Sequence, residues 1–276
     1  MRIVVTGAGG GLGRALLAAV PSHHDVTPLT HRDLDIGDHD AVMATLVPLA
    51  PDLVINTAAF TDVDANETDI SRAFRDNAQG PQSLALAARS FGGVLLHVST
   101  DYVFDGEKAA PYDETDEPRP ISGYGRAKLL GERMVRELHP AHLIVRVGYV
   151  FGGGADYLSG QLAALRAGAS AAGIDDRVGS PTYVRHLAER LVPLALTRRF
   201  GTYHLAGSEA TTWFDVLQRC VRRAGLPGDV TRQLAADLDL PAPRPAFSAL
   251  VSVLMENLSL PPMPSLDDAI DDWIGR

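Results

Sequence analysis

Cysteine is nearly absent from this chain of 276 residues. Cys220 stands alone, so no disulfide can form within the chain. The stretch from Trp213 to Val221 has the spacing of an amphipathic helix, and we expect the thiol on its buried side. Long apolar runs are also missing, because the N-terminal apolar stretch is too short for a signal peptide and no segment approaches a membrane span. We therefore expect a cytoplasmic protein.

Clusters of positive charge are missing as well. The formal net charge is −9 and the pI is near 5.4, so we expect neither nucleic acid nor an anionic membrane as a partner. A phosphorylated substrate can still be held by local arginines. No Gly-Lys-Ser or Gly-Lys-Thr P-loop is present, which argues against a nucleoside triphosphatase. The nine histidines include no spaced ligand pair, and we expect no metal.

The composition is that of a globular protein, with 46% apolar and 21% charged residues. Through roughly the first 150 residues, short β-branched runs alternate with amphipathic stretches, which is the pattern of a parallel sheet covered on both faces. We predict an α/β fold, a Rossmann-type doubly wound parallel sheet with a small C-terminal substrate-binding lobe. The predicted strands are 2–6, 25–30, 52–57, 95–98 and 142–147, and the predicted helices are 14–20, 38–49, 70–90 and 124 to near 140.

A glycine-rich segment follows the first predicted strand. It reads Gly7-Ala8-Gly9-Gly10-Gly11-Leu12-Gly13 and leads into a predicted helix. Strand, glycine turn and helix form the context of a dinucleotide fingerprint, in which backbone amides at the helix N-terminus hold a pyrophosphate. The glycines recur every third residue instead of in the strict G-x-G-x-x-G order, and a glycine-rich hairpin is the alternative interpretation.

The domain boundaries follow from where this regular pattern ends. We assign 1–150 to an NAD(P)-binding Rossmann domain, because the chain beyond Gly152-Gly153-Gly154 is irregular and carries a proline-rich run at 241–245. The segment Tyr203-His204-Leu205-Ala206 is typical of a strand that returns to the main sheet, so about 183–206 belongs with the first domain. The segments 151–182 and 207–276 form the predicted lobe.

Tyr124 and Lys128 are the most informative pair. They lie four positions apart on a predicted helix and share one face. The ammonium is therefore expected to lower the pKa of the phenol from its ordinary value of about 10, which makes Tyr124 a proton donor for a carbonyl. Alone, Y-x-x-x-K is often an ordinary surface pair. Here it follows Ser99 and Thr100, which end a predicted buried strand, where open α/β sheets bind their ligands.

Seven segments stand in the following order: Gly7-x-x-Gly10-x-x-Gly13, Leu34-Asp35-Ile36, Asn56-Thr57-Ala58-Ala59-Phe60-Thr61-x-Val63-Asp64, Ser99-Thr100-Asp101-Tyr102-Val103-Phe104-x-Gly106, Tyr124-x-x-x-Lys128-x-x-x-Glu132, Gly179-Ser180-Pro181-Thr182 and Arg244-Pro245-x-x-Ser248-x-Leu250. Together, and nearly end to end, they resemble the dTDP-4-dehydrorhamnose reductase family of extended short-chain dehydrogenases. The resemblance implies NAD(P)H-dependent reduction of the 4-keto group of a dTDP-linked 4-keto-6-deoxyhexose. The product epimer lies beyond the motifs.

The resemblance also implies roles for individual residues. Tyr124 delivers the proton, Lys128 holds the nicotinamide ribose and lowers the pKa of the phenol, and Thr100 bonds the carbonyl oxygen or tunes Tyr124. Asn77 matches a position that supports the lysine, with a satisfied polar helix residue as the alternative. The implied cofactor contacts are Gly7, Gly10, Gly11, Leu12, Gly13, Arg32, Asp35, Ile36, Ala58, Ala59, Phe60, Thr61, Asn77, Ser99, Tyr124 and Lys128.

NADPH is the expected cofactor, with NADH as the alternative. Thr30 stands where members that use NADH carry an acidic residue, so Arg32 can pair with the 2′-phosphate unless it is simply solvated. The implied substrate contacts are Thr100, Asp101, Tyr124, Tyr149 and Arg244. Tyr149 replaces a tryptophan of some relatives and has a core position as its alternative, while a surface turn is the alternative for Arg244.

Other residues receive structural interpretations. Asp62 and Asp64 are read as turn or capping residues, and His97 as a packed neutral imidazole. Ala15 stands where some relatives carry an acidic residue linked to a metal-bridged dimer, so the sequence does not determine the oligomeric state. Two rival functions stay open: a cofactor-binding regulatory subunit, of the kind seen in the methionine adenosyltransferase β-subunit, and a nucleotide-sugar epimerase or dehydratase with tightly bound NAD⁺.

Overall fold

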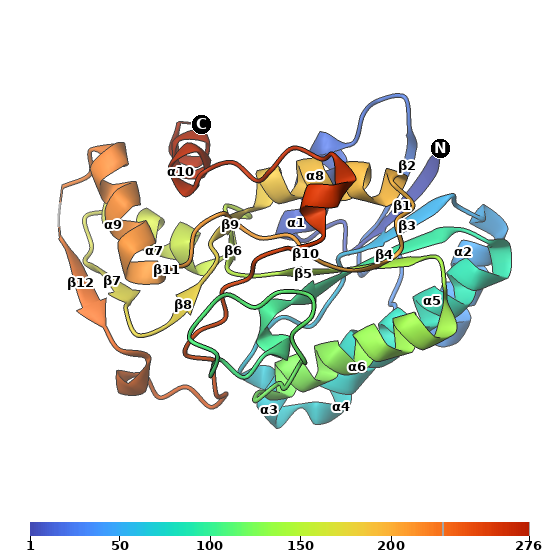
Figure 1. The fold of residues 1–276 in the computed structure, drawn as a ribbon, viewed down its shortest axis with the longest axis horizontal. Coiled ribbons are helices and arrows are strands. Elements are labelled where there is room, and N and C mark those ends of the chain that lie inside the picture. The colour runs from blue at the N-terminus through green and yellow to red at the C-terminus, as the bar shows by residue number, and fades with distance from the viewer. Residues whose placement is uncertain (228, 276) are drawn as a thin grey trace.

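A six-stranded parallel sheet forms the centre of the computed structural model, which describes residues 1–227 and 229–275 (Figure 1). The strand order is β10-β5-β4-β3-β1-β2. β2 pairs with one side of β1 and β3 with the other, so the carboxyl ends of β1 and β3 flank the point where the winding reverses and ligands bind. The strands are β1 (Arg2–Thr6), β2 (Asp25–Leu29), β3 (Leu53–Asn56), β4 (Val94–Thr100), β5 (His142–Val147) and β10 (Gly201–His204).

Helices cover both faces of this sheet (Figure 1). Successive residues of a strand point to opposite faces, so Ile3 and Val5 of β1 belong to one apolar core and Val4 to the other. The first core is closed by α1 (Gly11–Ala19) and α8 (Val184–Leu196), and the second by α2 (His39–Leu49), α5 (Gly80–Phe91) and α6 (Gly123–Leu138). The predicted doubly wound sheet is confirmed, including the returning strand β10, which pairs with β5.

The helix predicted over about 70–90 is present as a continuous helical run, but it is not a uniform α-helix. The chain instead forms α4 (Ile70–Phe74), a π-helical turn (Arg75–Gln79) and then α5, after the short α3 (Ala65–Thr68). Pro81 explains the π-helical turn, because proline has no N–H to donate to the carbonyl of Asn77 one turn back. That carbonyl packs instead against Gly131 of α6, where an added Cβ would lie 2.3 Å from the oxygen.

A smaller group of elements lies at the other end of the molecule (Figure 1). Its core contains Phe151, Leu158, Leu217, Ile270 and the thiol of Cys220, which is fully buried as expected. The main core, by contrast, is covered in part by a late segment that includes Met255 and Met263. The elements are β6 (Val150–Phe151), α7 (Tyr157–Arg166), β7 (Ala171–Ile174), β8 (Val178–Gly179), β9 (Thr182–Tyr183), β11 (Thr211–Thr212), α9 (Trp213–Ala224), β12 (Val230–Gln233) and α10 (Leu266–Ile274). Within the described ranges, none of the helices combines the length and apolarity needed to cross a bilayer.

Candidate active site

The N-terminus of α6 is anchored so that Tyr124 lies beside the end of β4. Ser122 caps the helix, since its Oγ accepts a hydrogen bond from the Gly125 amide at 3.0 Å. Gly125 packs so closely on the carbonyl of Tyr102 that a Cβ would lie 2.1 Å from the oxygen. The Tyr102 and Tyr124 rings meet edge to face with centroids 6.0 Å apart. The helix start is therefore fixed against the 3₁₀ turn Asp101–Val103 that follows β4.

The phenol of Tyr124 lies in an apolar and acidic environment. Burial raises the pKa of Tyr124 to about 12, the neighbouring carboxyl of Asp101 raises it too, and the hydroxyl of Thr100 acts in the opposite direction. The sequence predicts that Lys128 lowers this pKa, but in this structure desolvation outweighs any such effect. Tyr124 is therefore protonated at neutral pH, which is the form required of a proton donor.

Asp101 is a buried acid at the same strand end. It is 3% exposed, and its carboxyl accepts hydrogen bonds from Ser248 Oγ at 2.5 Å and Thr100 Oγ1 at 3.0 Å. Burial raises the pKa of Asp101 to about 7, although both hydroxyls favour the ionised form. The carboxyl therefore titrates close to neutral pH.

This shift predicts how stability depends on pH. Between the ordinary pKa near 4 and the native value of about 7, the folded protein holds a proton that the unfolded chain has lost, so stability from Asp101 is present below pH 4 and falls as pH rises to 7. The total loss is at most about 4 kcal/mol. We expect Asp101→Asn to gain stability relative to the native protein on going from pH 5 to pH 8, as measured by urea unfolding. An equal difference at both pH values would contradict this assignment.

Lys128 is buried behind Tyr124, one turn further along α6. Its side chain is 2% exposed, and Nζ donates a hydrogen bond to the carbonyl of Val98 at 2.7 Å. Burial lowers the pKa of Lys128 to about 8, and the carboxylate of Glu132 opposes that shift. Lys128 is therefore poised between its two protonation states near neutral pH.

A cleft of about 380 Å³ opens at the carboxyl ends of β1 and β3. It brings together six of the residues expected to contact the cofactor, which come from three segments far apart in the chain. These are Gly7, Gly10, Asp35, Ile36, Ala58 and Ala59. His31, Arg72 and Asp76 also line the cleft and were not anticipated.

Two glycines of the loop are required by close packing. Gly7 has φ +73°, and a Cβ there would lie 2.5 Å from the Ala58 amide nitrogen. A Cβ on Gly13 would lie 2.3 Å from the Gly7 carbonyl oxygen, so this residue allows α1 to approach β1. The turn thus leaves a backbone-lined hollow at the N-terminus of α1, a form suited to a pyrophosphate. The residues present therefore fit a dinucleotide cofactor.

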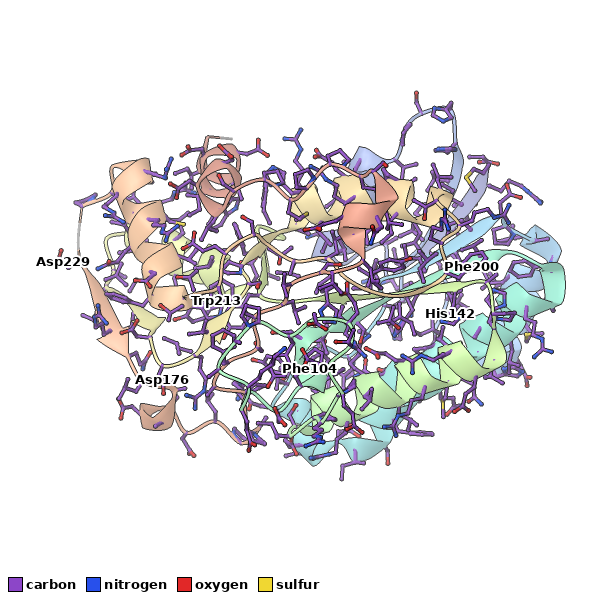
Figure 2. All side chains as sticks on the ribbon, viewed as in Figure 1. Phe104, His142, Asp176, Phe200, Trp213 and Asp229 are labelled. Atoms are coloured by element: carbon purple, nitrogen blue, oxygen red, sulfur yellow. The ribbon has the colours of Figure 1, made fainter. Side chains whose placement is uncertain are left out.

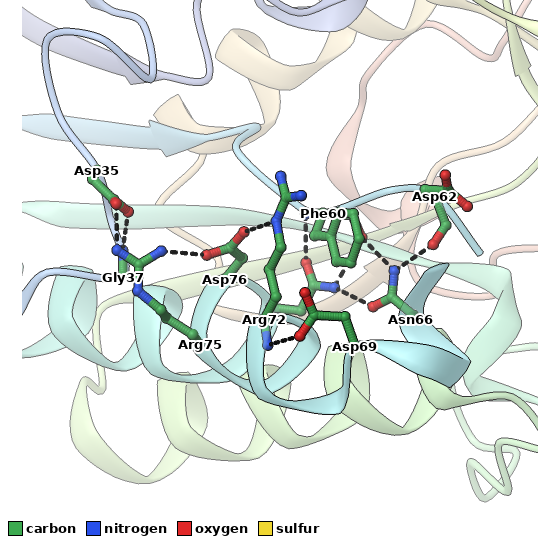
Figure 3. A network of polar contacts seen from close by, with 10 residues as sticks. Asp35, Gly37, Phe60, Asp62, Asn66, Asp69, Arg72, Arg75 and Asp76 are labelled. Carbon is green, nitrogen blue, oxygen red and sulfur yellow. Dashed lines mark hydrogen bonds and ion pairs between the residues drawn. The ribbon is translucent and has the colours of Figure 1, made fainter. Parts of the chain in front are cut away.

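Polar contacts along one edge hold the wall of this cleft (Figure 3). The guanidinium of Arg72 lies 4.0 Å above the Phe60 ring, and Arg75 pairs with Asp35. Asn77 donates to the Phe60 carbonyl at 2.9 Å and accepts from the Phe60 amide at 2.9 Å. The side chain of Asn77 thus fixes the loop after β3, and only its backbone carbonyl faces α6.

The remaining predicted cofactor residues lie around this cleft or in the packing behind it. Ser99 directs its hydroxyl to Glu132 at 2.6 Å, so its side chain is already committed. Arg32 and Thr61 are exposed, Leu12 is half-buried, and Gly11 packs against Gly153. Arg14, which was not anticipated, reaches across this contact to donate to the Gly153 carbonyl at 2.8 Å.

Tyr149, an expected substrate contact, comes two residues after the end of β5. Its backbone has φ 46°, in the left-handed region that non-glycine residues rarely occupy and that often signals function. Its ring stacks on Trp213 with centroids 4.6 Å apart, and Figure 2 shows Trp213 at the end of the molecule where α9 lies. This half-buried ring therefore connects the segment after β5 with the start of α9.

Arg244 is bound in an ion pair. Its guanidinium makes a two-point contact with Asp64, with distances of 3.0 and 2.8 Å. Asp64 lies in the turn that starts α3, as expected, but its side chain pairs with Arg244 and does not cap the helix, whereas Asp62 accepts a hydrogen bond from the Ala65 amide at 2.9 Å. Arg177, in the loop between β7 and β8, was overlooked, and its buried Nε has no hydrogen-bond partner in the described part of the chain.

The described residues include no group of three or more His, Cys, Asp or Glu side chains arranged to hold a metal ion. The chemistry available at this site is instead that of a hydroxyl, a phenol and an amine at a strand end beside a dinucleotide cleft. Fold and site together define a class, the Rossmann-type reductases of the short-chain dehydrogenase kind.

Comparison with known proteins narrows this class. A family model described as the RmlD substrate binding domain matches residues 1–276. A dTDP-4-dehydrorhamnose reductase of Mycobacterium tuberculosis is 40% identical over 264 residues, covering 91% of this chain and 85% of the relative. The chain therefore belongs to the RmlD family, as its motifs predict.

Two solved structures resemble this chain along nearly its whole length. The dTDP-4-dehydrorhamnose reductase ortholog of Clostridium acetobutylicum has a TM-score of 0.96 at 33% identity, and covers 100% of this chain and 99% of that one. The Bacillus anthracis dTDP-4-dehydrorhamnose reductase in complex with NADP has a TM-score of 0.95 at 30% identity, and covers 99% and 98%.

Proposed function

We propose that this protein reduces the 4-keto group of a dTDP-4-keto-6-deoxyhexose, with NADPH as the hydride source. The observation that carries the proposal is that Thr100 at the end of β4 hydrogen-bonds Tyr124, while Lys128, one turn along α6, bonds the Val98 carbonyl of the same strand, in a chain of the RmlD family. Relatives with this family model include dTDP-4-dehydrorhamnose reductases, and one structural relative is described with NADP.

Each residue of the site has a distinct role in the proposed reduction. A bound reduced nicotinamide supplies a hydride to the carbonyl carbon. Negative charge then grows on the carbonyl oxygen, and Tyr124, protonated at neutral pH, transfers its proton there. The Thr100 hydroxyl orients the same oxygen or the phenol. The backbone at Gly7 and Gly10 would hold the pyrophosphate, with Asp35 and Ile36 beside the adenosine.

The decisive experiment follows NADPH oxidation with a panel of dTDP-4-keto-6-deoxy sugars and determines the product by NMR. Turnover giving a 4-hydroxy sugar supports the proposal, and the NMR spectrum identifies the epimer. Purified protein that carries stoichiometric NAD⁺ and returns it unchanged would indicate an epimerase or dehydratase. Cofactor binding without turnover on any sugar would indicate a regulatory subunit.

The cofactor phosphate gives a separate prediction. Arg32 is exposed in the turn after β2, where it can pair with a 2′-phosphate, and a charge-assisted hydrogen bond contributes about 1.5–3 kcal/mol. We expect Arg32→Ala to raise KM for NADPH roughly tenfold or more and to leave KM for NADH unchanged. His31→Ala is the matched comparison, because His31 lines the cleft. Equal effects of Arg32→Ala on both cofactors would remove Arg32 from the phosphate site.

Nucleotide anchoring gives another prediction. Arg244 is only 18% exposed at its side chain and adjoins Tyr102, so a diphosphate that reaches it meets a preorganised cation. We expect Arg244→Ala to raise KM for the dTDP-sugar about tenfold, with KM for NADPH unchanged. An unchanged KM for the sugar, or equal reduction of the free keto sugar, would contradict nucleotide anchoring. Arg177→Ala tests whether the guanidinium of Arg177, whose Nη1 already pairs with Asp176, shares this role.

A further inference from the structure

Four buried polar side chains form a line across the sheet beneath the cofactor cleft. They are Thr6 of β1, Asn56 of β3, His97 of β4 and Lys128 of α6, and each is at most 2% exposed. Thr6 Oγ1 lies 2.7 Å from Asn56 Oδ1, Asn56 Nδ2 lies 2.9 Å from His97 Nδ1, and His97 Nε2 lies 3.4 Å from Lys128 Nζ. Of these four, only Lys128 belongs to the group of residues on which the proposed function rests.

The direction of the hydrogen bonds is set at Asn56. The backbone amide of Ala58 donates to its Oδ1 at 3.1 Å, and an amide hydrogen can only be a donor. The side-chain oxygen is thereby identified, so the NH₂ group must face His97. Nδ1 of His97 therefore accepts a hydrogen bond.

His97 is a neutral imidazole. Burial holds its pKa well below the ordinary value. A neutral imidazole carries one hydrogen, and because Nδ1 accepts, that hydrogen lies on Nε2. The ring thus presents an N–H donor to Lys128.

We propose that His97 is a positioning residue that favours the neutral amine of Lys128, because Asn56 fixes its imidazole as the Nε2–H tautomer. An amine can donate to the Val98 carbonyl and accept from His97 with its lone pair, whereas an ammonium has no lone pair to accept with. The other tautomer of His97 is unfavourable, since its Nδ1–H would face the NH₂ of Asn56 and two donors would meet.

The other ionisable neighbours of Lys128 do not supply this effect. Glu132, on the next turn of α6, favours the ammonium and is already paired with Arg146 of β5 at 2.7 Å. Tyr124, one turn earlier, is protonated and uncharged. His97 from β4 is therefore the neighbour that acts with burial, and not against it, on the charge of Lys128.

This inference rests on the proposed function for its purpose. A lysine with a pKa of about 8 can take up and release a proton near neutral pH, whereas one with an ordinary pKa stays charged. Lys128 could then return a proton to Tyr124 after each turnover.

The chain is well suited to a direct test, because it contains only two lysines, Lys108 and Lys128. Protein labelled with ¹³C at lysine Cε gives one signal for each, and titration of the signal reports its protonation. We expect His97→Leu to move the Lys128 midpoint upward by about one pH unit, the scale of one strong local interaction. The partly exposed Lys108 is the internal reference.

His142→Leu is the matched control. His142 is also a buried strand histidine, but Figure 2 places it toward the opposite end of the sheet from Phe104, which follows the Asp101–Val103 turn. The control should leave the Lys128 midpoint in place. A midpoint that stays constant or falls in His97→Leu would overturn the proposal.

Two further measurements keep the test decisive if His97→Leu does not fold. Asn56→Asp replaces the NH₂ donor by an acceptor, which inverts the His97 tautomer and should raise the Lys128 midpoint, whereas a constant or lower midpoint contradicts the proposal. Long-range ¹H–¹⁵N spectra of the native protein should show His97 protonated on Nε2, and protonation on Nδ1 would overturn the assignment. Neither measurement needs substrate or turnover, so failure here is distinct from failure of the proposed reductase activity.

Discussion

Tyr124→Phe is expected to lower turnover by about 10²-fold or more, the scale of positioned acid catalysis, while NADPH binds as before. The change removes the phenolic hydroxyl and keeps the ring whose edge-to-face contact with Tyr102 helps to hold the start of α6. Loss of the proton donor leaves the growing charge on the carbonyl oxygen without its nearest acid. Steady-state kinetics with the keto sugar measure turnover, and fluorescence titration measures NADPH affinity.

Tyr203→Phe is the matched control for that change. Its hydroxyl donates to the Arg199 carbonyl at 2.8 Å from the edge strand β10, outside the site. Turnover in this variant should stay within about twofold of the native value, because the hydrogen bond of Tyr203 has no catalytic role. Near-native turnover of Tyr124→Phe itself would remove the phenol from the mechanism.

Arg146→Met is expected to destabilise the fold by about 3–5 kcal/mol, because it leaves a buried carboxylate without its partner. Arg146 is 3% exposed and Glu132 is fully buried, and they form hydrogen bonds of 2.9 and 2.7 Å between β5 and α6. The free energy of unfolding in urea measures the effect. A double variant, Arg146→Met with Glu132→Leu, should recover most of the loss, since it buries no charge.

The control for this ion pair lies on the surface. Arg119 and Glu117 pair at 3.1 Å with side chains that are 70% and 77% exposed. Arg119→Met should cost less than about 1 kcal/mol, as exposed pairs do. If Arg146→Met costs no more than Arg119→Met, the buried pair does not stabilise the connection between β5 and α6.

Local patterns were sufficient for the sheet and for the face of α6. The apolar run of β5 follows Pro140 and has the predicted bounds, and the spacing of Tyr124 and Lys128 places both toward β4. The spacing of these residues does not determine their pKa values, which depend on desolvation. Both residues have pKa values dominated by burial, which depends on the packing of the whole domain around them.

Contacts between distant segments were beyond prediction from one sequence. Asp64 and Arg244 are 180 residues apart, and neither has a local pattern that names its partner. The π-helical turn before α5 could have been predicted from the sequence, since Pro81 cannot donate to the carbonyl four residues back. The sequence does not say where the freed carbonyl of Asn77 turns, because that depends on Gly131 in another helix.

Asn77 consequently contacts two separate parts of the candidate site, the loop after β3 and helix α6. Its side chain holds the loop that carries Phe60 through two hydrogen bonds. Its backbone carbonyl packs against Gly131 and limits how closely the helix bearing Tyr124 can approach. One residue thus fixes both a wall of the candidate cofactor cleft and the helix that bears the proposed proton donor. A shift of the π-helical turn would therefore move the loop and the helix together and preserve their alignment.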